Sequence, residues 1–189
     1  MSNRMFTVSC RLALAACMLL AAPLAGRASA DDRVEIDAKA DAALRRLHKQ
    51  VKGADELLGA AKGVLVVPEV KKAGFVVAGQ WGKGALRVGG KTVDYYRMEA
   101  GSAGFQAGYQ EADFVFLFLT DAALAKFRAG KGWTVGAEAG VTVIDKAAAV
   151  SADTLRNSKP VVAFVFGKEG LMAGWSAEGT KFTRFEPKD

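Results

Sequence analysis

The sequence predicts an α+β fold: a curved antiparallel β-sandwich or barrel-like sheet with an amphipathic N-terminal helix and a short central helix. First, apolar residues recur at helical spacing between residues 31 and about 52. Second, eight or nine short β-rich segments follow from Gly63 onward. Third, 20 of the 21 glycines lie after residue 30, several of them inside these segments. Glycines within strands mark bends and bulges, which indicates a strongly curved sheet.

The first predicted element is the N-terminal helix. Its apolar stripe consists of Ile36, Ala40, Leu44, Leu47 and Val51. Acidic residues occupy its first part and basic residues its last part, which suits the helix dipole. Gly53 is the expected end of the helix.

The strand segments follow in order along the chain. Residues 64–67 form a short β-branched run that Pro68 is expected to close. Residues 85–88 and 92–97 flank Gly89-Gly90, a hairpin signal. The other segments expected to be strands are 75–77, 105–109, 114–119, 133–144, 161–166, 171–175 and 181–185. Of these, 114–119 is continuously apolar and is expected to be buried on both faces, and 133–144 alternates most clearly. Asp121 is expected to cap the short central helix, which runs through about Arg128.

Residues 1–30 have the order of a cleavable secretion signal. Arg4 and Arg11 come before an uncharged apolar run over 12–22. After this run, Ala28-Ser29-Ala30 supplies small residues for cleavage. The run is shorter than the roughly 20 residues that span a bilayer. A second interpretation stays open, because Leu14-Ala15-Ala16-Cys17 resembles a lipoprotein box. We therefore expect one domain over 31–189, exported to the periplasm, with lipid anchoring through Cys17 as the alternative.

Removal of the signal changes the charge and the cysteine content. Loss of Arg4, Arg11 and Arg27 lowers the formal net charge from +6 to +3. This mildly basic balance does not indicate a nucleic-acid partner. Both cysteines, Cys10 and Cys17, lie in the signal, so the remaining domain is expected to have no disulfide.

No catalytic or metal-binding motif is found. His48 is the one histidine, there is no GxSxG nucleophile elbow, and soft-metal ligands are lacking. Gly89-Gly90-Lys91-Thr92 lacks the glycine that a phosphate loop needs at position 85, and strand residues follow it. We expect a protein that is not an enzyme and that has no cofactor or metal.

Two basic clusters are candidate binding surfaces for anionic membrane lipid. One lies in the strand region, the other at the basic end of the first helix. Basic groups are attracted to anionic headgroups, and tryptophan suits the water–hydrocarbon boundary. The residues are Lys71, Lys72, Lys83, Arg87 and Lys91 with Trp81, and Arg45, Arg46 and Lys49. Two plainer interpretations stay open: solubilising lysines at strand ends, and a helix that packs on its own sheet rather than on a membrane.

Four blocks in order resemble the SYLF domain, a lipid-binding family, over about residues 55–186. They are Ala61-Lys62-Gly63-Val64-Leu65-Val66-Val67-Pro68 with residues 72–79, Gly104-Phe105-Gln106-Ala107-Gly108 with 113–118, residues 136–140, and residues 168–174 with 178–181. The resemblance implies a lipid-binding module. Eukaryotic relatives bind phosphoinositides through basic residues and an amphipathic N-terminal helix, and some fungal relatives bind actin.

The leading hypothesis is therefore a non-enzymatic envelope protein that binds anionic phospholipid surfaces. A carrier that encloses an acyl chain, or an envelope structural or interaction protein without a direct lipid role, is the alternative. A protein partner is not identified by the sequence.

Overall fold

The protein is described here from a computed structural model. The chain divides into two compact units, Met1–Ala30 and Asp31–Asp189, and the described residues all belong to the second. The structure describes residues 32–74, 77–103, 108–130, 132–136, 140–144, 159–168, 170–172, 175 and 177–188. The expected secretion signal and Cys17 lie outside the described residues.

The described part contains three helices and nine strands. The helices are α1 (Asp32–Gln50), α2 (Ala54–Ala60) and α3 (Asp121–Ala129). The strands are β1 (Gly63–Gly74), β2 (Val77–Val88), β3 (Lys91–Ala103), β4 (Gly108–Phe118), β5 (Trp133–Thr134), β6 (Val141–Ile144), β7 (Val161–Gly167), β8 (Gly170–Leu171) and β9 (Lys181–Phe185).

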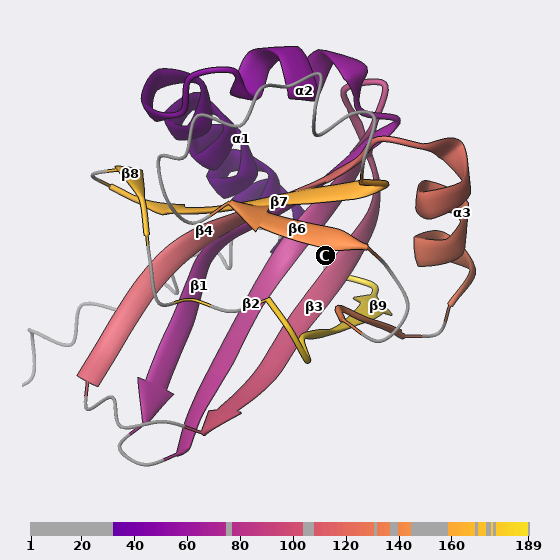
Figure 1. Ribbon diagram of the computed structural model, residues 1–189. Coiled ribbons are helices and arrows are strands. Elements are labelled where there is room, and N and C mark those ends of the chain that lie inside the picture. Colours follow the sequence, from indigo (N-terminus) through magenta and orange to yellow (C-terminus); the bar gives the residue numbers. More distant parts are fainter. Residues whose placement is uncertain are drawn as a thin grey trace, which may run out of the picture. The chain divides into compact units, whose positions relative to one another are not determined.

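The strands form one strongly twisted sheet in the order β5-β9-β3-β2-β1-β4-β7-β6, with β8 paired to β7. Figure 1 shows β7 crossing the direction of β1 and β2 steeply, as expected of a curled sheet. The predicted α+β class with a curved, barrel-like sheet is confirmed. The sheet is mixed, because β6 runs parallel to β7 while the other pairs are antiparallel.

Both faces of the sheet bury apolar side chains. On one face α1 packs through Ala40 and Leu47 onto Val66 of β1 and Val115 of β4. On the other face the aromatic rings of β4 pack with α3 and β9. The apolar run that ends β4 therefore contributes alternate residues to two cores, and its predicted burial on both faces is confirmed.

The two predicted helices are present. The first ends at Gln50, and Gly53, with φ of +81°, separates it from α2, a short helix that the sequence analysis did not predict. The cap of α3 is Thr120 rather than Asp121, because the Thr120 hydroxyl accepts a hydrogen bond from the Ala123 N–H at 3.2 Å.

The expected end of the first strand at Pro68 is wrong, because β1 continues through a β-bulge. Two residues of β1, Pro68 and Glu69, stand opposite the single residue Asp113 of β4. Pro68 has no N–H to donate, and Glu69 adopts the left-handed region with φ of +50°. The rotated N–H of Glu69 donates to Asp113 Oδ1 at 3.0 Å. A buried side chain thus replaces the missing ladder bond, and the strand can continue.

The Gly89-Gly90 hairpin is confirmed, with φ values of +58° and +78°. Its strands also contain an irregularity: Arg87 pairs with Thr92, but Leu86 pairs with Asp94, so Val93 is an extra residue in β3. This bulge sets which β3 side chains share a face with those of β2.

The prediction of one strand over 133–144 is wrong. Among its described residues, the strands are β5 and β6, and these lie at opposite ends of the sheet order. Val135 and Gly136 form a turn, in which Gly136 has φ of +105° and the Val135 N–H donates to the Thr180 carbonyl at 3.0 Å. Residues 137–139 lie outside the described part, as do Phe75, Val76 and 104–107 of other predicted strands. Of the described residues in the predicted segment 171–175, Leu171 belongs to a strand, whereas Met172 and Trp175 do not.

Candidate functional site

Helix α1 covers only part of its face of the sheet, and the area beyond it has a mixed basic and aromatic surface. We call this area the tryptophan face: Lys71, Trp81, Lys83, Arg97 and Glu99. The register places Lys71 beside Trp81, Trp81 beside Glu99, and Lys83 beside Arg97. These residues line an open pocket of about 390 Å³. Three consecutive strands, β1, β2 and β3, thus bring three basic side chains around one indole.

The indole of Trp81 lies along its own strand. Trp81 is 45% exposed, and its ring atoms are 3.6–3.7 Å from the position that a Cβ on Gly79 would occupy. The absence of a side chain at Gly79 therefore lets the ring rest against the sheet while it remains open to solvent. A large apolar ring with one N–H suits a boundary between water and hydrocarbon.

The basic groups of the tryptophan face differ in the contacts that their charges already make within the protein. The Lys71 side chain is exposed and makes no hydrogen bond or ion pair with any described residue. The Arg97 guanidinium lies 5.3 Å from the centre of the Phe185 ring. Lys83 Nζ is 3.0 Å from Asp32 Oδ2 of α1, so its charge is partly balanced within the protein. Lys71 and Arg97 are therefore the groups best placed to meet an external anion.

Lys72 lies on the opposite face of the sheet from its neighbour Lys71. Lys72 is only 7% exposed, and its Nζ lies 5.4 Å from the ring centre of Trp175 on the other face of the sheet. Arg97 and Glu99, by contrast, were not among the predicted residues. Strand alternation from Trp81 and Lys83 could have suggested them, had the bulge at Val93 been known.

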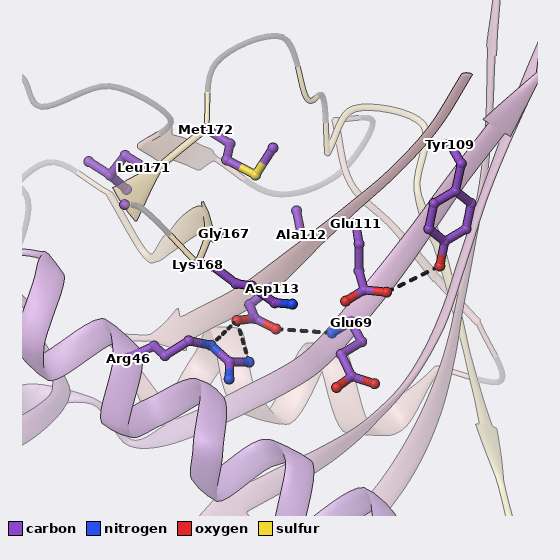
Figure 2. Close-up of a pocket in the computed structure, with 11 residues that line it drawn as sticks. Arg46, Glu69, Tyr109, Glu111, Ala112, Asp113, Gly167, Lys168, Leu171 and Met172 are labelled. Atoms are coloured by element: carbon purple, nitrogen blue, oxygen red, sulfur yellow. Dashed lines mark hydrogen bonds and ion pairs between the residues drawn. The ribbon is translucent and has the colours of Figure 1, made fainter. Parts of the chain in front are cut away.

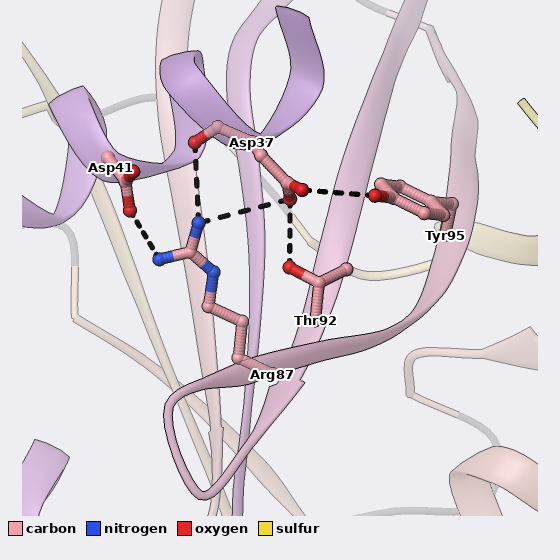
Figure 3. Close-up of polar contacts among 5 residues, drawn as sticks. All are labelled: Asp37, Asp41, Arg87, Thr92 and Tyr95. Carbon is pink, nitrogen blue, oxygen red and sulfur yellow. Dashed lines mark hydrogen bonds and ion pairs between the residues drawn. The ribbon is translucent and has the colours of Figure 1, made fainter. Parts of the chain in front are cut away.

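Arg87 of the strand cluster holds α1 on the hairpin. Its side chain is 14% exposed and donates to Asp41 Oδ1 at 2.5 Å and to the Asp37 carbonyl at 3.3 Å. The Asp37 carboxylate accepts hydrogen bonds from Thr92 and Tyr95 at 2.8 and 3.0 Å (Figure 3). Arg87 is thus occupied by an internal network.

Lys91 lies at the start of β3, immediately after the hairpin turn. It is exposed and has no ion pair with a described residue. It is not part of the tryptophan face.

The three basic residues of α1 that were predicted to bind lipid also have different surroundings. Arg46 donates from Nε and Nη2 to Asp113 Oδ2 at 2.8 and 2.7 Å, and the Asp113 side chain is only 5% exposed (Figure 2). Arg45 and Lys49 are exposed and form no ion pair with a described residue. Arg46 is therefore an anchor of the helix, whereas Arg45 and Lys49 remain available on its outer surface.

A second pocket, of about 750 Å³, lies between α1, β4 and the β7–β8 turn (Figure 2). We call it the β4 pocket. Its lining residues are Arg46, Glu69, Tyr109, Glu111, Ala112, Asp113, Gly167, Lys168, Gly170, Leu171 and Met172. Tyr109 is 59% exposed and its hydroxyl donates to Glu111 Oε2 at 3.1 Å. Desolvation, this hydrogen bond and the charges of Glu111 and Glu69 raise the pKa of Tyr109.

Within the described ranges no group of three or more His, Cys, Asp or Glu side chains is arranged to hold a metal ion. His48 contacts the carboxylate of Asp55 through Nδ1. In the same ranges no helix has the length and apolar character needed to cross a membrane.

Comparison with known proteins gives one family. The model of the Ysc84 family, described as "Las17-binding protein actin regulator", matches residues 99–186. A search of curated proteins found no match. The matched segment begins at Glu99 of the tryptophan face and includes β4 and the β7–β8 turn, so it contains most of the β4 pocket.

Proposed function

We propose that this chain, in which residues 99–186 match the Ysc84 (SYLF) family model, is a non-enzymatic protein of the cell envelope that binds anionic phospholipid surfaces. The observation that carries the proposal is the exposed indole of Trp81, which lies among Lys71, Lys83 and Arg97 on the uncovered part of the sheet. Lipid binding is also what the SYLF resemblance implies.

The chemistry of the tryptophan face fits this role. A basic side chain near an anionic membrane contributes about 1 kcal/mol of attraction. Lys71 and Arg97 supply two such charges, and an indole adds affinity for the interfacial region. Lys83 contributes less, because Asp32 already balances its charge.

The compartment determines which family properties carry over. The order of charges and small residues in 1–30 supports export to the periplasm, with anchoring through Cys17 as the alternative. The family description names an actin regulator. An exported chain would meet no actin, so we carry over the lipid binding that the SYLF resemblance implies and leave out the actin role.

The test is co-sedimentation of Asp31–Asp189, which forms one compact unit, with vesicles of graded phosphatidylglycerol in phosphatidylcholine at two salt concentrations. We expect binding that rises with the anionic fraction and falls with salt, because salt screens exposed charges. The double variant Lys71→Gln/Arg97→Gln should bind at least about tenfold more weakly, since two interfacial charges are lost. Trp81→Ala should also bind more weakly.

The matched control is Lys62→Gln/Lys91→Gln, which removes the same charge from exposed positions outside the tryptophan face. It should bind more tightly than the Lys71/Arg97 variant. Equal binding of wild type to neutral and anionic vesicles would contradict the proposal.

A further inference from the structure

Two opposite charges that line the β4 pocket have no ionic partner among the residues that the structure describes. The Glu111 carboxylate accepts a hydrogen bond from the neutral Tyr109 hydroxyl and forms no ion pair among the described residues. Lys168 is exposed, and its ammonium makes no ion pair within the same ranges. Lys71 is in register with Glu111 across β1 and β4 but forms no ion pair with it.

The other charges of the pocket are balanced internally. Arg46 is held by Asp113 at 2.7 Å, and Lys39 Nζ lies 2.9 Å from Glu69 Oε2. Glu111 and Lys168 are therefore the charges in this pocket that an external group could neutralise.

The two residues come from different elements, with an apolar wall in the same pocket. Glu111 is on β4, and Lys168 is in the turn between β7 and β8. Figure 2 shows Leu171 and Met172 above the pocket, on the side of the β7–β8 turn, and Glu111 with Tyr109 on the β4 side. A volume of about 750 Å³ is in the size range of small-molecule sites, roughly 300–1,000 Å³. The pocket thus offers an anion, a cation and an apolar surface together.

We propose that the β4 pocket binds the headgroup of a single phosphoethanolamine lipid, with the ammonium on Glu111 and the phosphate on Lys168. A purely anionic headgroup would satisfy Lys168 but would place more negative charge beside Glu111 and Glu69. In phosphoethanolamine, an ammonium and a phosphate are joined by two carbons, so the ammonium would pair with Glu111 and the phosphate with Lys168. Each contact would be a charge-assisted hydrogen bond. The glycerol and the first acyl carbons would contact Leu171 and Met172.

The position of the pocket supports a lipid as the source of this headgroup, and in this respect the inference rests on the proposed function. Glu69 lines both the β4 pocket and the pocket of the tryptophan face. Lys71 is in register with Trp81 on one side and with Glu111 on the other. A membrane held by the tryptophan face would therefore lie next to the β4 pocket.

The experiment is titration of Asp31–Asp189 by calorimetry with short-chain lipids below their micelle concentration. The probes are dihexanoyl-phosphatidylethanolamine, dihexanoyl-phosphatidylglycerol and glycerophosphoethanolamine, which has the headgroup without chains. We expect the ethanolamine lipid to bind more tightly than the glycerol lipid. Glu111→Gln should weaken binding of the ethanolamine lipid by about tenfold or more, the effect of one lost charge-assisted hydrogen bond. Lys168→Gln should weaken binding of both lipids.

The matched controls are Glu186→Gln and Lys91→Gln, which remove the same charges outside both the β4 pocket and the tryptophan face and should leave both affinities unchanged. Circular dichroism and thermal unfolding would verify that each variant is folded. Equal affinity of wild type for the two lipids, or an unchanged affinity of Glu111→Gln, would overturn the inference. Binding of glycerophosphoethanolamine as tight as that of the lipid would overturn the lipid assignment.

Failure here is distinguishable from failure of the proposed function. Glu111→Gln should retain binding to phosphatidylglycerol vesicles, which depends on Lys71 and Arg97. If wild type binds those vesicles but does not discriminate between the short-chain lipids, only the pocket assignment falls. If it binds the ethanolamine lipid but no vesicle, the membrane-surface proposal falls and the pocket assignment stands.

Discussion

Adjacent residues of the same type have different surroundings in this protein. Arg45 is exposed on α1, whereas Arg46 makes a two-pronged contact with the buried Asp113 carboxylate. Lys71 lies on the tryptophan face, whereas Lys72 is buried on the other side of the sheet. The role of a basic residue here is set by the acidic or aromatic group opposite it, and its type alone is a poor guide.

The pair of arginines gives a prediction about stability. Arg46→Gln would leave the carboxylate of Asp113 buried without its cation, which costs about 3 kcal/mol when such a pair is broken. Arg45→Gln should change the free energy of unfolding by less than about 0.5 kcal/mol, as is usual for an exposed position. Urea denaturation of both variants measures the difference. Similar values for the two would show that the contact between Arg46 and Asp113 is not an anchor.

At the scale of elements, the sequence indicated most helices and strands but not their irregularities. The periodicity of α1, the Gly89-Gly90 hairpin and the apolar end of β4 are local patterns, and the structure confirms them. The sequence predicts that a strand ends at Pro68, because Asp113, whose carboxylate accepts the Glu69 N–H and lets the strand continue, is 45 residues away. The break within 133–144 depends on a backbone bond from Val135 to Thr180, which is equally distant in the sequence.

Two bulges decide which side chains lie on the tryptophan face. Without the extra residue at Pro68 and Glu69, the register that holds at Val66 would continue and would place Val70 rather than Lys71 beside Trp81. Without the extra residue Val93, the register of the hairpin would place Tyr96 rather than Arg97 beside Lys83. A shift of one residue moves every side chain of a strand to the other face, so the candidate site could be listed from the sequence only in part.

Helix α1 offers an element-scale prediction, because its packing on the sheet distinguishes it from a helix that inserts into a membrane. Leu47 is fully buried, so Leu47→Ala should lower the free energy of unfolding by about 3 kcal/mol through lost contacts and a cavity. Val34, which is 62% exposed on the same helix, is the control, and Val34→Ala should have little effect. Equal stability of the two variants in urea denaturation would mean that α1 is not part of the core.

For the whole molecule, the described unit combines one stable sheet with two neighbouring sites on one face. The tryptophan face carries unpaired cations, and the β4 pocket carries one unpaired charge of each sign among its described lining residues. Such an arrangement would let one contact with a membrane engage a surface and a single lipid together. The two sites can be separated by Lys71→Gln/Arg97→Gln and by Glu111→Gln.

The N-terminal segment gives a prediction that concerns the whole chain. When the full sequence is expressed with an export pathway, mass spectrometry of the product should find Asp31 as its first residue, because Ala28-Ser29-Ala30 presents small residues for cleavage. A product that begins at a lipid-modified Cys17 would contradict cleavage after Ala30 and establish the anchored form.

The sequence by itself determined the α+β class, the two longer helices, the Gly89-Gly90 hairpin and the SYLF resemblance, because each depends on patterns of neighbouring residues. Only the tertiary structure decided that Arg46 and Arg87 are occupied by carboxylates of other elements, and that Arg97 and Glu111 join the candidate sites. The physical reason is that ion pairs, strand register and bulges depend on residues that meet only when distant segments pair.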